Sequence, residues 1–216
     1  MKIDSSSRVL LGTICTVAIA VGVSLVVFIP SLWISIPLAL LLAWFCAWQV
    51  YFFHVPERTR TAGERDLTAV ADGKVVICSR VFEEEVLHAE CIQVSIYMNF
   101  FDVHANFWPA DGTVTHYRYH PGKHMLAFKP KASLENEHSC VILDVCGRPV
   151  FFKQIAGGFA RRIVCNAVEG STVRGGEQCG IIKFGSRIDY YLPLDAVVKV
   201  SLGETVRACR TVIAEI

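Results

Sequence analysis

GIIKFGSRIDYYLP, residues 180–193, is the stretch around which the rest of the chain is organised. β-type residues on both sides, Gly180–Lys183 and Tyr190–Leu192, enclose one Gly-Ser bond. Gly185 has no Cβ to shield its carbonyl, and the hydroxyl of Ser186 lies one bond away from that carbonyl. This bond is therefore sterically open to attack by its own serine. Gly-Ser pairs are also common in turns, so the surroundings must decide between the two interpretations.

The region around this stretch reads as a series of short strands. Runs rich in Val, Ile, Phe, Tyr and Thr are separated by Gly, Pro, Asp and Asn, which is typical of a β barrel or sandwich. One short helix is predicted, around Gly157–Arg162. The expected strands are Lys74–Cys78, Cys91–Tyr97, Gly112–Tyr119, Cys140–Val145, Val150–Ile155, Ile163–Ala167, Gly180–Lys183, Tyr190–Leu192, Ala196–Val200 and Thr211–Glu215.

Two similar turns in the last third, Glu169–Gly176 and Leu202–Cys209, refine this fold class. They resemble the turns of lipoyl- and biotinyl-type barrel sandwiches. The modifiable lysine of those carriers, in an M-K or D-K context, is not evident. We therefore expect a mainly β, barrel-sandwich-hybrid-like domain that is not a swinging-arm carrier.

The N-terminal part of the chain has a different character. Of the 216 residues 53% are apolar and 19% charged, and Val9–Phe53 contains no Asp, Glu, Lys, Arg or His. A helix that crosses a bilayer needs about 20 apolar residues, so this length suits two. Pro30-Ser31, with Pro37 soon after, supplies a break between spans at Val9–Ile29 and Leu32–Phe53. We predict a membrane-anchoring helical hairpin over residues 1–54 and a second domain over 55–216.

Basic residues flank the apolar hairpin at both ends. Lys2 and Arg8 precede it, and Arg58, Arg60 and Arg65 follow it. The positive-inside rule then places both ends, and with them the second domain, on the cytoplasmic side of the cell membrane. A signal peptide fits less well, because no A-x-A-like site follows the first span. A hairpin that only dips into one leaflet stays open.

Charge and cysteine content exclude several classes of protein. The net charge of +1 argues against a nucleic-acid partner. Nine cysteines form an odd set with no C-x-x-C pair, and no histidine stands at zinc-ligand spacing, so we expect free thiols in a reducing compartment and no metal site.

Self-attack at Gly185-Ser186 would need a base and a carboxylate. His104 in FDVHANFWP and Asp72 in ADG supply one of each, although taken singly they read as a core histidine and a turn residue. The sequence does not show that the three meet in space. An ordinary serine hydrolase using Ser186 fits poorly, because the chain has no G-x-S-x-G elbow.

Taken together, several stretches resemble the phosphatidylserine decarboxylase family in its short, membrane-associated form, over most of residues 50 to 216. The site FGSR departs from the LGST of the longer members and is similar to the archaetidylserine-decarboxylating branch. The stretches that carry the resemblance are PERT, ADGKVV, CIQVSIYMNFFDVHANFWPADGTV, YHPGKHMLAFKPKASLENEH, QIAGGFARRIVC and GIIKFGSRIDYYLP.

The resemblance implies a proenzyme that cuts itself between Gly185 and Ser186. Ser186 would be left as a pyruvoyl group, the only cofactor, which forms a Schiff base with phosphatidylserine and yields phosphatidylethanolamine. On the family pattern His104 is the base and Asp72 its orienting partner. The products would be a β chain, 1–185, and an α chain, 186–216, held together without a covalent bond.

Three points stay open at this stage. The substrate could carry a diacylglycerol or an archaeal-type ether backbone, and the chain could form a homo-oligomer. A membrane-anchored barrel-sandwich module that binds a ligand without catalysis is the alternative from another functional class.

Overall fold

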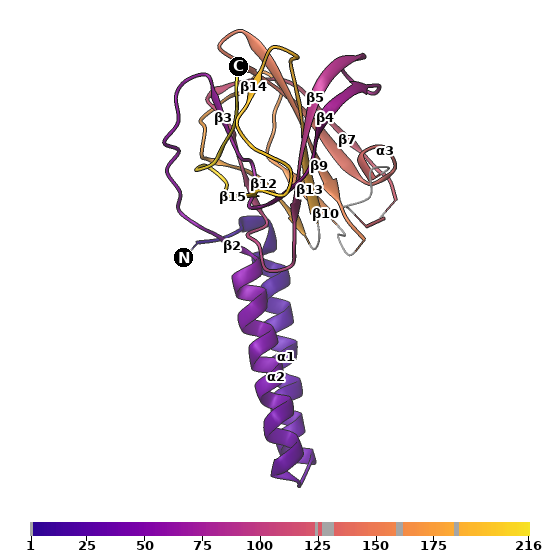
Figure 1. The fold of residues 1–216 in the computed structure, drawn as a ribbon. Helices are drawn as coiled ribbons and strands as arrows, with labels where there is room; N and C mark the ends of the chain where they lie inside the picture. The colour runs from indigo at the N-terminus through magenta and orange to yellow at the C-terminus, as the bar shows by residue number, and fades with distance from the viewer. Residues whose placement is uncertain (1, 124, 127–131, 159–161, 184–185) are drawn as a thin grey trace. The chain divides into compact units, whose positions relative to one another are not determined.

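The computed structural model describes residues 2–123, 125–126, 132–158, 162–183 and 186–216. The chain divides after Pro56 into two compact units (Figure 1). The first is helical and the second is mainly β, which confirms the predicted fold class.

Two long apolar helices form the N-terminal unit, α1 (Arg8–Phe28) and α2 (Leu32–Phe52). Both are long and apolar enough to cross a membrane by length and composition. They match the predicted spans within a residue at each end. The chain turns at residues 29–31, whereas Pro37 lies inside α2 and does not end it. A two-stranded sheet joins β1 (Lys2–Ile3) to β2 (His54–Val55).

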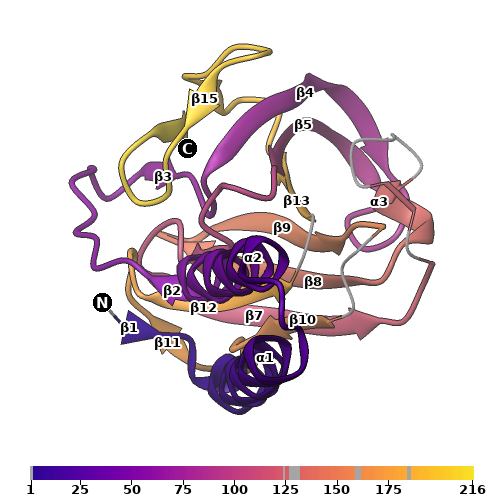
Figure 2. The same ribbon diagram turned by 90° about the horizontal axis from the view of Figure 1, so that it is seen from below.

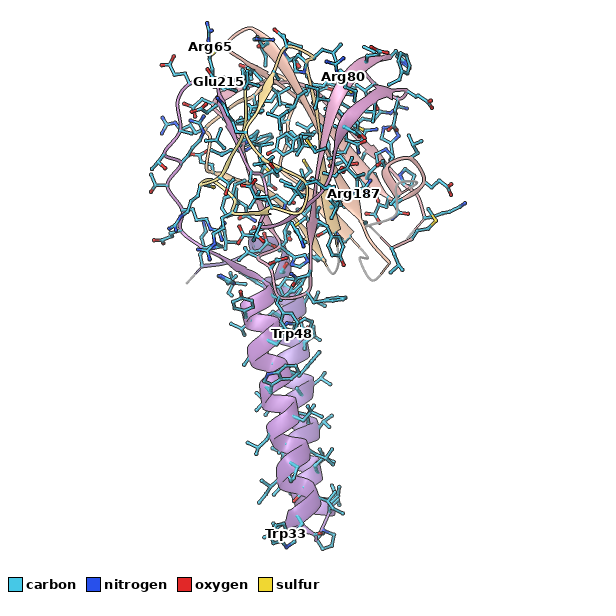
Figure 3. The ribbon with its side chains drawn as sticks, viewed as in Figure 1. Trp33, Trp48, Arg65, Arg80, Arg187 and Glu215 are labelled. Atoms are coloured by element: carbon cyan, nitrogen blue, oxygen red, sulfur yellow. The ribbon has the colours of Figure 1, made fainter. Side chains whose placement is uncertain are left out.

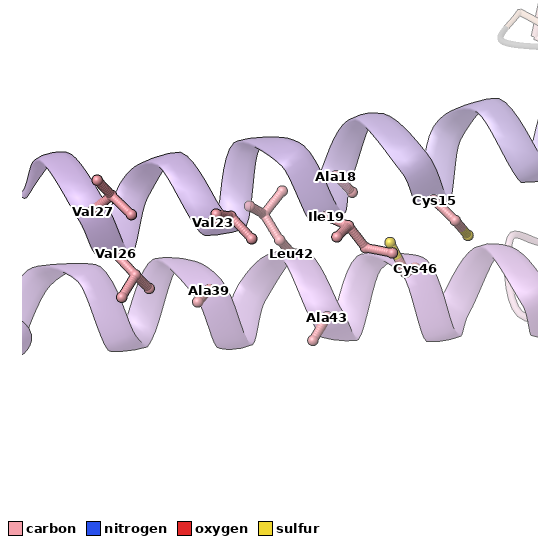
Figure 4. A pocket seen from close by; sticks show the side chains of 11 residues that line it. Cys15, Ala18, Ile19, Val23, Val26, Val27, Ala39, Leu42, Ala43 and Cys46 are labelled. Carbon is pink, nitrogen blue, oxygen red and sulfur yellow. The ribbon is translucent and has the colours of Figure 1, made fainter.

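The helices α1 and α2 contact each other along their length and leave an apolar space between them. Figure 4 shows side chains of both helices pointing into the space between them. The residues that line this space are Cys15, Ala18, Ile19, Gly22, Val23, Val26, Val27, Ala39, Leu42, Ala43 and Cys46.

The β unit is built on one antiparallel sheet of eight strands in the order β11-β7-β8-β9-β13-β5-β4-β15. The sheet curls, so that β4 and β5 arch away from the plane of β7 to β9 (Figure 2). Its strands are β4 (Gly73–Glu83), β5 (Ala89–Met98), β7 (Gly112–His120), β8 (His138–Val145), β9 (Arg148–Ala156), β11 (Thr172–Val173), β13 (Ser186–Leu192) and β15 (Thr205–Val206).

Two three-stranded sheets complete the unit, in the orders β10-β12-β6 and β14-β16-β3. The apolar core is formed by side chains from all three sheets, among them Val94, Phe152 and Ile182. These elements and the one short helix are β3 (Asp66–Thr68), β6 (Ala105–Phe107), β10 (Arg162–Cys165), β12 (Gln178–Lys183), β14 (Val197–Val198), β16 (Val212–Glu215) and α3 (Ala132–Glu135).

All ten predicted strands overlap observed ones, but the prediction of a helix at Gly157–Arg162 does not hold where it can be seen. Residues 159–161 lie outside the described part of the chain, and Arg162 opens β10. Six short strands, β1, β2, β3, β6, β11 and β15, and the helix α3 were not predicted. Each is two to four residues long, which is too short for a periodic pattern. All nine cysteines are free, as expected.

Candidate active site

Ser186 is the first residue of β13, a strand with neighbours on both sides. Its register partners are Met98 on β5 and Ala156 on β9. The side chain is fully buried, and Oγ lies 3.5 Å from the Met98 sulfur. Gly185, the other half of the predicted cleavage site, lies outside the described residues. A serine hydroxyl is therefore held in a dry interior at the start of a central strand.

The rest of β13 fixes the position of Ser186. Side chains alternate along a strand, so Ser186, Ile188 and Tyr190 share the face that meets the core. The hydroxyl of Tyr190 accepts a hydrogen bond from the backbone N–H of Val70 and donates one to the carbonyl of Thr68, both at 2.8 Å. β13 is thus tied to the segment that leads into Asp72.

His104 is a buried histidine immediately before β6. Its Nδ1 lies 2.9 Å from the backbone carbonyl of Asp102. A carbonyl oxygen can only accept, so Nδ1 carries the proton and Nε2 the lone pair of a neutral ring. Burial lowers the pKa of His104 to about 4. The imidazole is therefore neutral near pH 7 and able to take up a proton at Nε2.

Two indirect contacts link the segments that carry His104 and Ser186. The N–H of Ile182, in the strand that leads toward Ser186, lies 3.4 Å from the carbonyl oxygen of His104. Met98 provides a second link, because its sulfur lies 3.5 Å from Ser186 Oγ and 3.9 Å from Asn106 Nδ2, on the strand that follows His104. In the part of the chain that the structure describes, Ser186 Oγ makes no hydrogen bond to His104.

Asp72 has a different partner from the one predicted. Its carboxylate forms a two-pronged ion pair with the guanidinium of Arg58, with Nη2 2.6 Å from Oδ2, and accepts a hydrogen bond from the N–H of Ala208 at 2.8 Å. Within the described ranges it makes no hydrogen bond to His104. It does lie close enough to Asp102 to raise the pKa of that carboxyl, a smaller effect than burial.

Local backbone geometry explains the position of Asp72. Gly73 has a φ of 154°, and a Cβ there would lie 2.3 Å from the carbonyl oxygen of Tyr97. Glycine is therefore required where the turn after Asp72 meets β5. Arg58 lies 5.8 Å from the ring centroid of Phe107, a cation–π distance.

Arg187 and Asp189 were missed as site residues. Both side chains are fully buried on the opposite face of β13 from Ser186. Arg187 Nε lies 2.7 Å from Asp189 Oδ1, and Ser133 and Gln93 hydrogen-bond to Asp189 Oδ2 (Figure 3 labels Arg187). Opposite charges two residues apart inside an apolar strand were the available signal, since such residues share one face.

Comparison with known proteins identifies the family of the chain. The family model described as phosphatidylserine decarboxylase matches residues 45–214. A relative from Amoebophilus asiaticus, named phosphatidylserine decarboxylase proenzyme, is 44% identical over 170 residues, 78% of this chain and 76% of its own length. Relatives with that name from Porphyromonas gingivalis and Parabacteroides distasonis are 36% and 38% identical, over 100% of this chain and 99% of theirs. The chain belongs to the phosphatidylserine decarboxylase family.

Proposed function

We propose that this chain is a proenzyme that cuts itself at Gly185-Ser186 and then decarboxylates phosphatidylserine to phosphatidylethanolamine. The observation that carries the proposal is the position of Ser186, a buried hydroxyl at the first residue of a central strand, near a buried neutral histidine. The proenzyme names of the relatives and their coverage of the whole chain support it.

Self-cleavage would begin with the Ser186 hydroxyl. Oγ attacks the carbonyl carbon of Gly185, the C–N bond breaks, and an ester to Oγ replaces the amide. The Oγ proton passes to a base and then to the released amine. We assign the base to His104, whose Nε2 carries the lone pair. The imidazolium that forms is short-lived, because burial disfavours the charged ring and favours rapid return of the proton.

The second step breaks the new ester. Removal of the Cα proton of Ser186 expels the Gly185 carboxylate from Cβ and leaves dehydroalanine at position 186. Addition of water then releases ammonia and leaves a pyruvoyl group. Since each step rearranges atoms already present, apart from one water, no external oxidant or cofactor is needed.

The surroundings of Ser186 suit a pyruvoyl group that is formed from this residue. Residue 186 has apolar neighbours, Met98 and Ala156, and is closed to solvent, so a carbonyl there is protected from bulk water. A pyruvoyl group supplies a carbonyl that captures the substrate's amine and accepts the electrons left when carbon dioxide departs. His104 would hold the proton that is returned to the substrate carbon.

We keep Asp72 in the proposal as a positioning residue. Its ion pair with Arg58 anchors the segment before β4, and its carboxylate lies close to Asp102, whose backbone carbonyl orients His104. Substitution of Asp72 by Asn should therefore slow cleavage less than loss of Ser186. Complete cleavage at the normal rate in that variant would remove Asp72 from the mechanism.

The two cleavage products would stay associated. β13 pairs with β9 along six residues and with β5 along seven, while β15 and β16 pair with β4 and β3. All three belong to the 186–216 chain, and each neighbour belongs to the 1–185 chain. We therefore propose a non-covalent β/α heterodimer, with no higher oligomer implied.

We further propose that residues 1–54 anchor the enzyme in the cell membrane, with the domain over residues 55–216 in the cytoplasm. The two apolar helices and the flanking basic residues support this orientation. A membrane-bound enzyme meets a lipid substrate whose acyl chains never leave the bilayer.

Substitution of Ser186 by Ala tests the proposal. The variant should remain one full-length chain and release no carbon dioxide from phosphatidylserine, because no hydroxyl attacks the Gly185 carbonyl. Ser201→Ala, an exposed serine in the same C-terminal region, is the matched control and should cleave normally. Cleavage of the Ser186→Ala chain at this bond would overturn the assignment.

Measurement of cleavage together with carbon dioxide release also distinguishes two alternative functions. Normal cleavage without carbon dioxide release from diacyl or ether-linked serine lipids would favour a binding module. Release from the ether-linked lipid alone would assign the chain to archaetidylserine.

A further inference from the structure

Four side chains with metal-binding atoms converge at a place distinct from Ser186. Glu85 lies in the turn between β4 and β5, His120 ends β7, and His138 and Cys140 lie on β8. One ligand atom from each lies within 4.8 Å of every other. Since the four residues come from three separate segments, no short sequence motif reveals them.

Strand pairing explains how these residues meet. His120 and His138 are direct register partners, and their rings stack in parallel with centroids 4.7 Å apart. Because an imidazole lone pair lies in the plane of its ring, one of the two rings must turn about its side-chain bonds to bind the same ion as the other. Cys140, two residues beyond His138, lies on the same face of β8. The β4–β5 hairpin brings Glu85 to this face because the sheet curls (Figure 2).

The turn that carries Glu85 is held rigidly. Glu83 Oε2 accepts hydrogen bonds from the backbone N–H groups of Val86 and Leu87, both at 2.7 Å. Glu83 Oε1 pairs with Lys153 Nζ at 2.9 Å, and this lysine is fully buried. The loop is therefore ordered before any ligand binds.

His138 presents a specific chemical problem. Its Nδ1 lies 2.6 Å from the carbonyl oxygen of Asn136 and must donate a proton to it. Nε2 of the neutral ring then has only a lone pair, yet it lies 2.9 Å and 3.1 Å from the two oxygens of Glu85. Two lone pairs repel at this distance. Either a second proton or a cation must lie between them.

The two oxygens of Glu85 have different surroundings. Oε2 lies 2.6 Å from the ammonium of Lys153, whereas Oε1 lies 2.9 Å from His138 Nε2 and 3.2 Å from His120 Nδ1. Lys153 thus holds Oε2 of the Glu85 carboxylate, and Oε1 faces both imidazoles. An outer hydrogen bond of this kind is usual for a metal-binding carboxylate, as is the Asn136 carbonyl for a metal-binding histidine.

We propose that Glu85, His120, His138 and Cys140 bind one Zn²⁺ ion. Two imidazole nitrogens, one sulfur and one carboxylate oxygen are ligands that zinc accepts in tetrahedral sites. Zinc–ligand bonds of about 2.0–2.3 Å place tetrahedral ligands roughly 3.3–3.8 Å apart, within the spread observed here. Four protein ligands leave no open position, so the site is structural and not catalytic.

Local charge is consistent with this ion. Zn²⁺ and Lys153 together would balance the Cys140 thiolate, Glu83 and Glu85, which leaves the buried group neutral. A free cysteine thiol carries a proton, whereas a cysteine ligand binds zinc as the thiolate. Coordination by zinc replaces that proton, as is usual for cysteine ligands.

The ion would join parts of the sheet that are not adjacent. β4 and β5 are separated from β7 and β8 by β9 and β13. A zinc ion between the β4–β5 turn and β8 would clamp the curled sheet across its concave face. The proposal does not depend on self-cleavage, which can be measured separately in every variant.

Metal content of the purified full-length protein tests the site. We expect about one zinc per chain by elemental mass spectrometry after dialysis against metal-free buffer. Cys140→Ser should lower this content at least tenfold. Cys78→Ser, which removes an exposed thiol elsewhere on β4, is the matched control and should keep the full content.

Cobalt substitution identifies the ligands directly. Co²⁺ in place of zinc should give the visible bands of a tetrahedral ion and a near-ultraviolet thiolate-to-cobalt band, which Cys140→Ser should abolish and Cys78→Ser should retain. If Cys140→Ser fails to fold, His120→Gln, a partly exposed position, provides the second variant. Zinc content no higher than in the variants, or cobalt without a thiolate band, would overturn the proposal and leave a protonated His138 paired with Glu85.

Discussion

We propose that the hydroxyl of Ser186 is made reactive by its position. Serine is a weak nucleophile unless a base can take its proton. The structure offers a neutral imidazole nearby, since the Asp102 carbonyl fixes the tautomer of His104 and burial keeps the ring uncharged. The predictions for pH dependence follow from the tautomer and the charge state of His104.

Self-cleavage should tolerate mild acid. Burial lowers the pKa of His104 to about 4, so the base stays unprotonated well below the usual histidine value of about 6.5. We expect a constant cleavage rate from about pH 8 to pH 5 and a fall near pH 4. Proenzyme made by cell-free synthesis and shifted in pH, then followed on gels, measures this. A fall centred near pH 6.5 would contradict the buried, neutral state.

The lowered pKa of His104 also makes the stability of the folded chain depend on pH. Between pH 6.5 and 4 the unfolded chain binds a proton at His104 that the folded chain does not. The contribution of His104 to stability is therefore lost as pH falls through this window.

Removal of the Arg187 side chain should be far more damaging than removal of an exposed arginine. Arg187→Met leaves Asp189 as a buried, uncompensated charge, which costs about 3–5 kcal/mol. Arg148→Met breaks a pair with the exposed Asp195 and should cost about 0–1 kcal/mol. Denaturant unfolding of both variants measures the difference. Equal losses would show that the buried pair is not needed to neutralise Asp189.

Residue types alone identified Ser186, His104 and Asp72 as candidates, but not their contacts. Asp72 pairs with Arg58, which lies in the PERT stretch and was predicted only to flank the membrane hairpin. Spacing along the chain does not reveal the proposed zinc ligands, because His120 and His138 meet across two paired strands. Contacts of this kind depend on register, which a single sequence does not specify.

At the scale of elements, β13 is the strand that carries Ser186, the residue at which cleavage is proposed. The predicted strand covered only Tyr190–Leu192, because Arg187 and Asp189 look unlike buried strand residues. Their mutual ion pair allows the strand to begin at Ser186.

The turn at Gly73 should be sensitive to replacement of its glycine. A Cβ at Gly73 would meet the Tyr97 carbonyl at 2.3 Å, so Gly73→Ala must displace the turn that carries Asp72. Gly147→Ala, at a φ of 80° with open space around it, is the control and should cost only about 1–2 kcal/mol of backbone strain. We expect a lower melting temperature and slower cleavage for Gly73→Ala. Equal melting temperatures of the two variants would contradict the close approach to β5.

Hydrophobic periodicity predicted the existence of most strands and of both helices, since these elements are long or uniformly apolar. It failed for β6, whose three residues lie between a loop and Trp108, and for α3. Both depend on tertiary contacts: the Phe107 N–H bonds to the Val70 carbonyl, and Ser133 on α3 bonds to Asp189.

At the scale of the whole molecule, we propose that the β unit lies in the cytoplasm. Cys78 and Cys146 are exposed on that unit and report its location. A maleimide that cannot cross membranes should label neither cysteine in intact cells and should label both after permeabilisation. Labelling in intact cells would contradict the orientation inferred from the flanking basic residues.

Intact-mass analysis of the purified wild-type protein tests the central claim most directly. We predict two chains that co-elute under native conditions, one with the mass of residues 1–185 and one lighter by one ammonia than residues 186–216. The loss of ammonia is specific to conversion of Ser186 into a pyruvoyl group. A single full-length chain with an unmodified Ser186 would contradict the account.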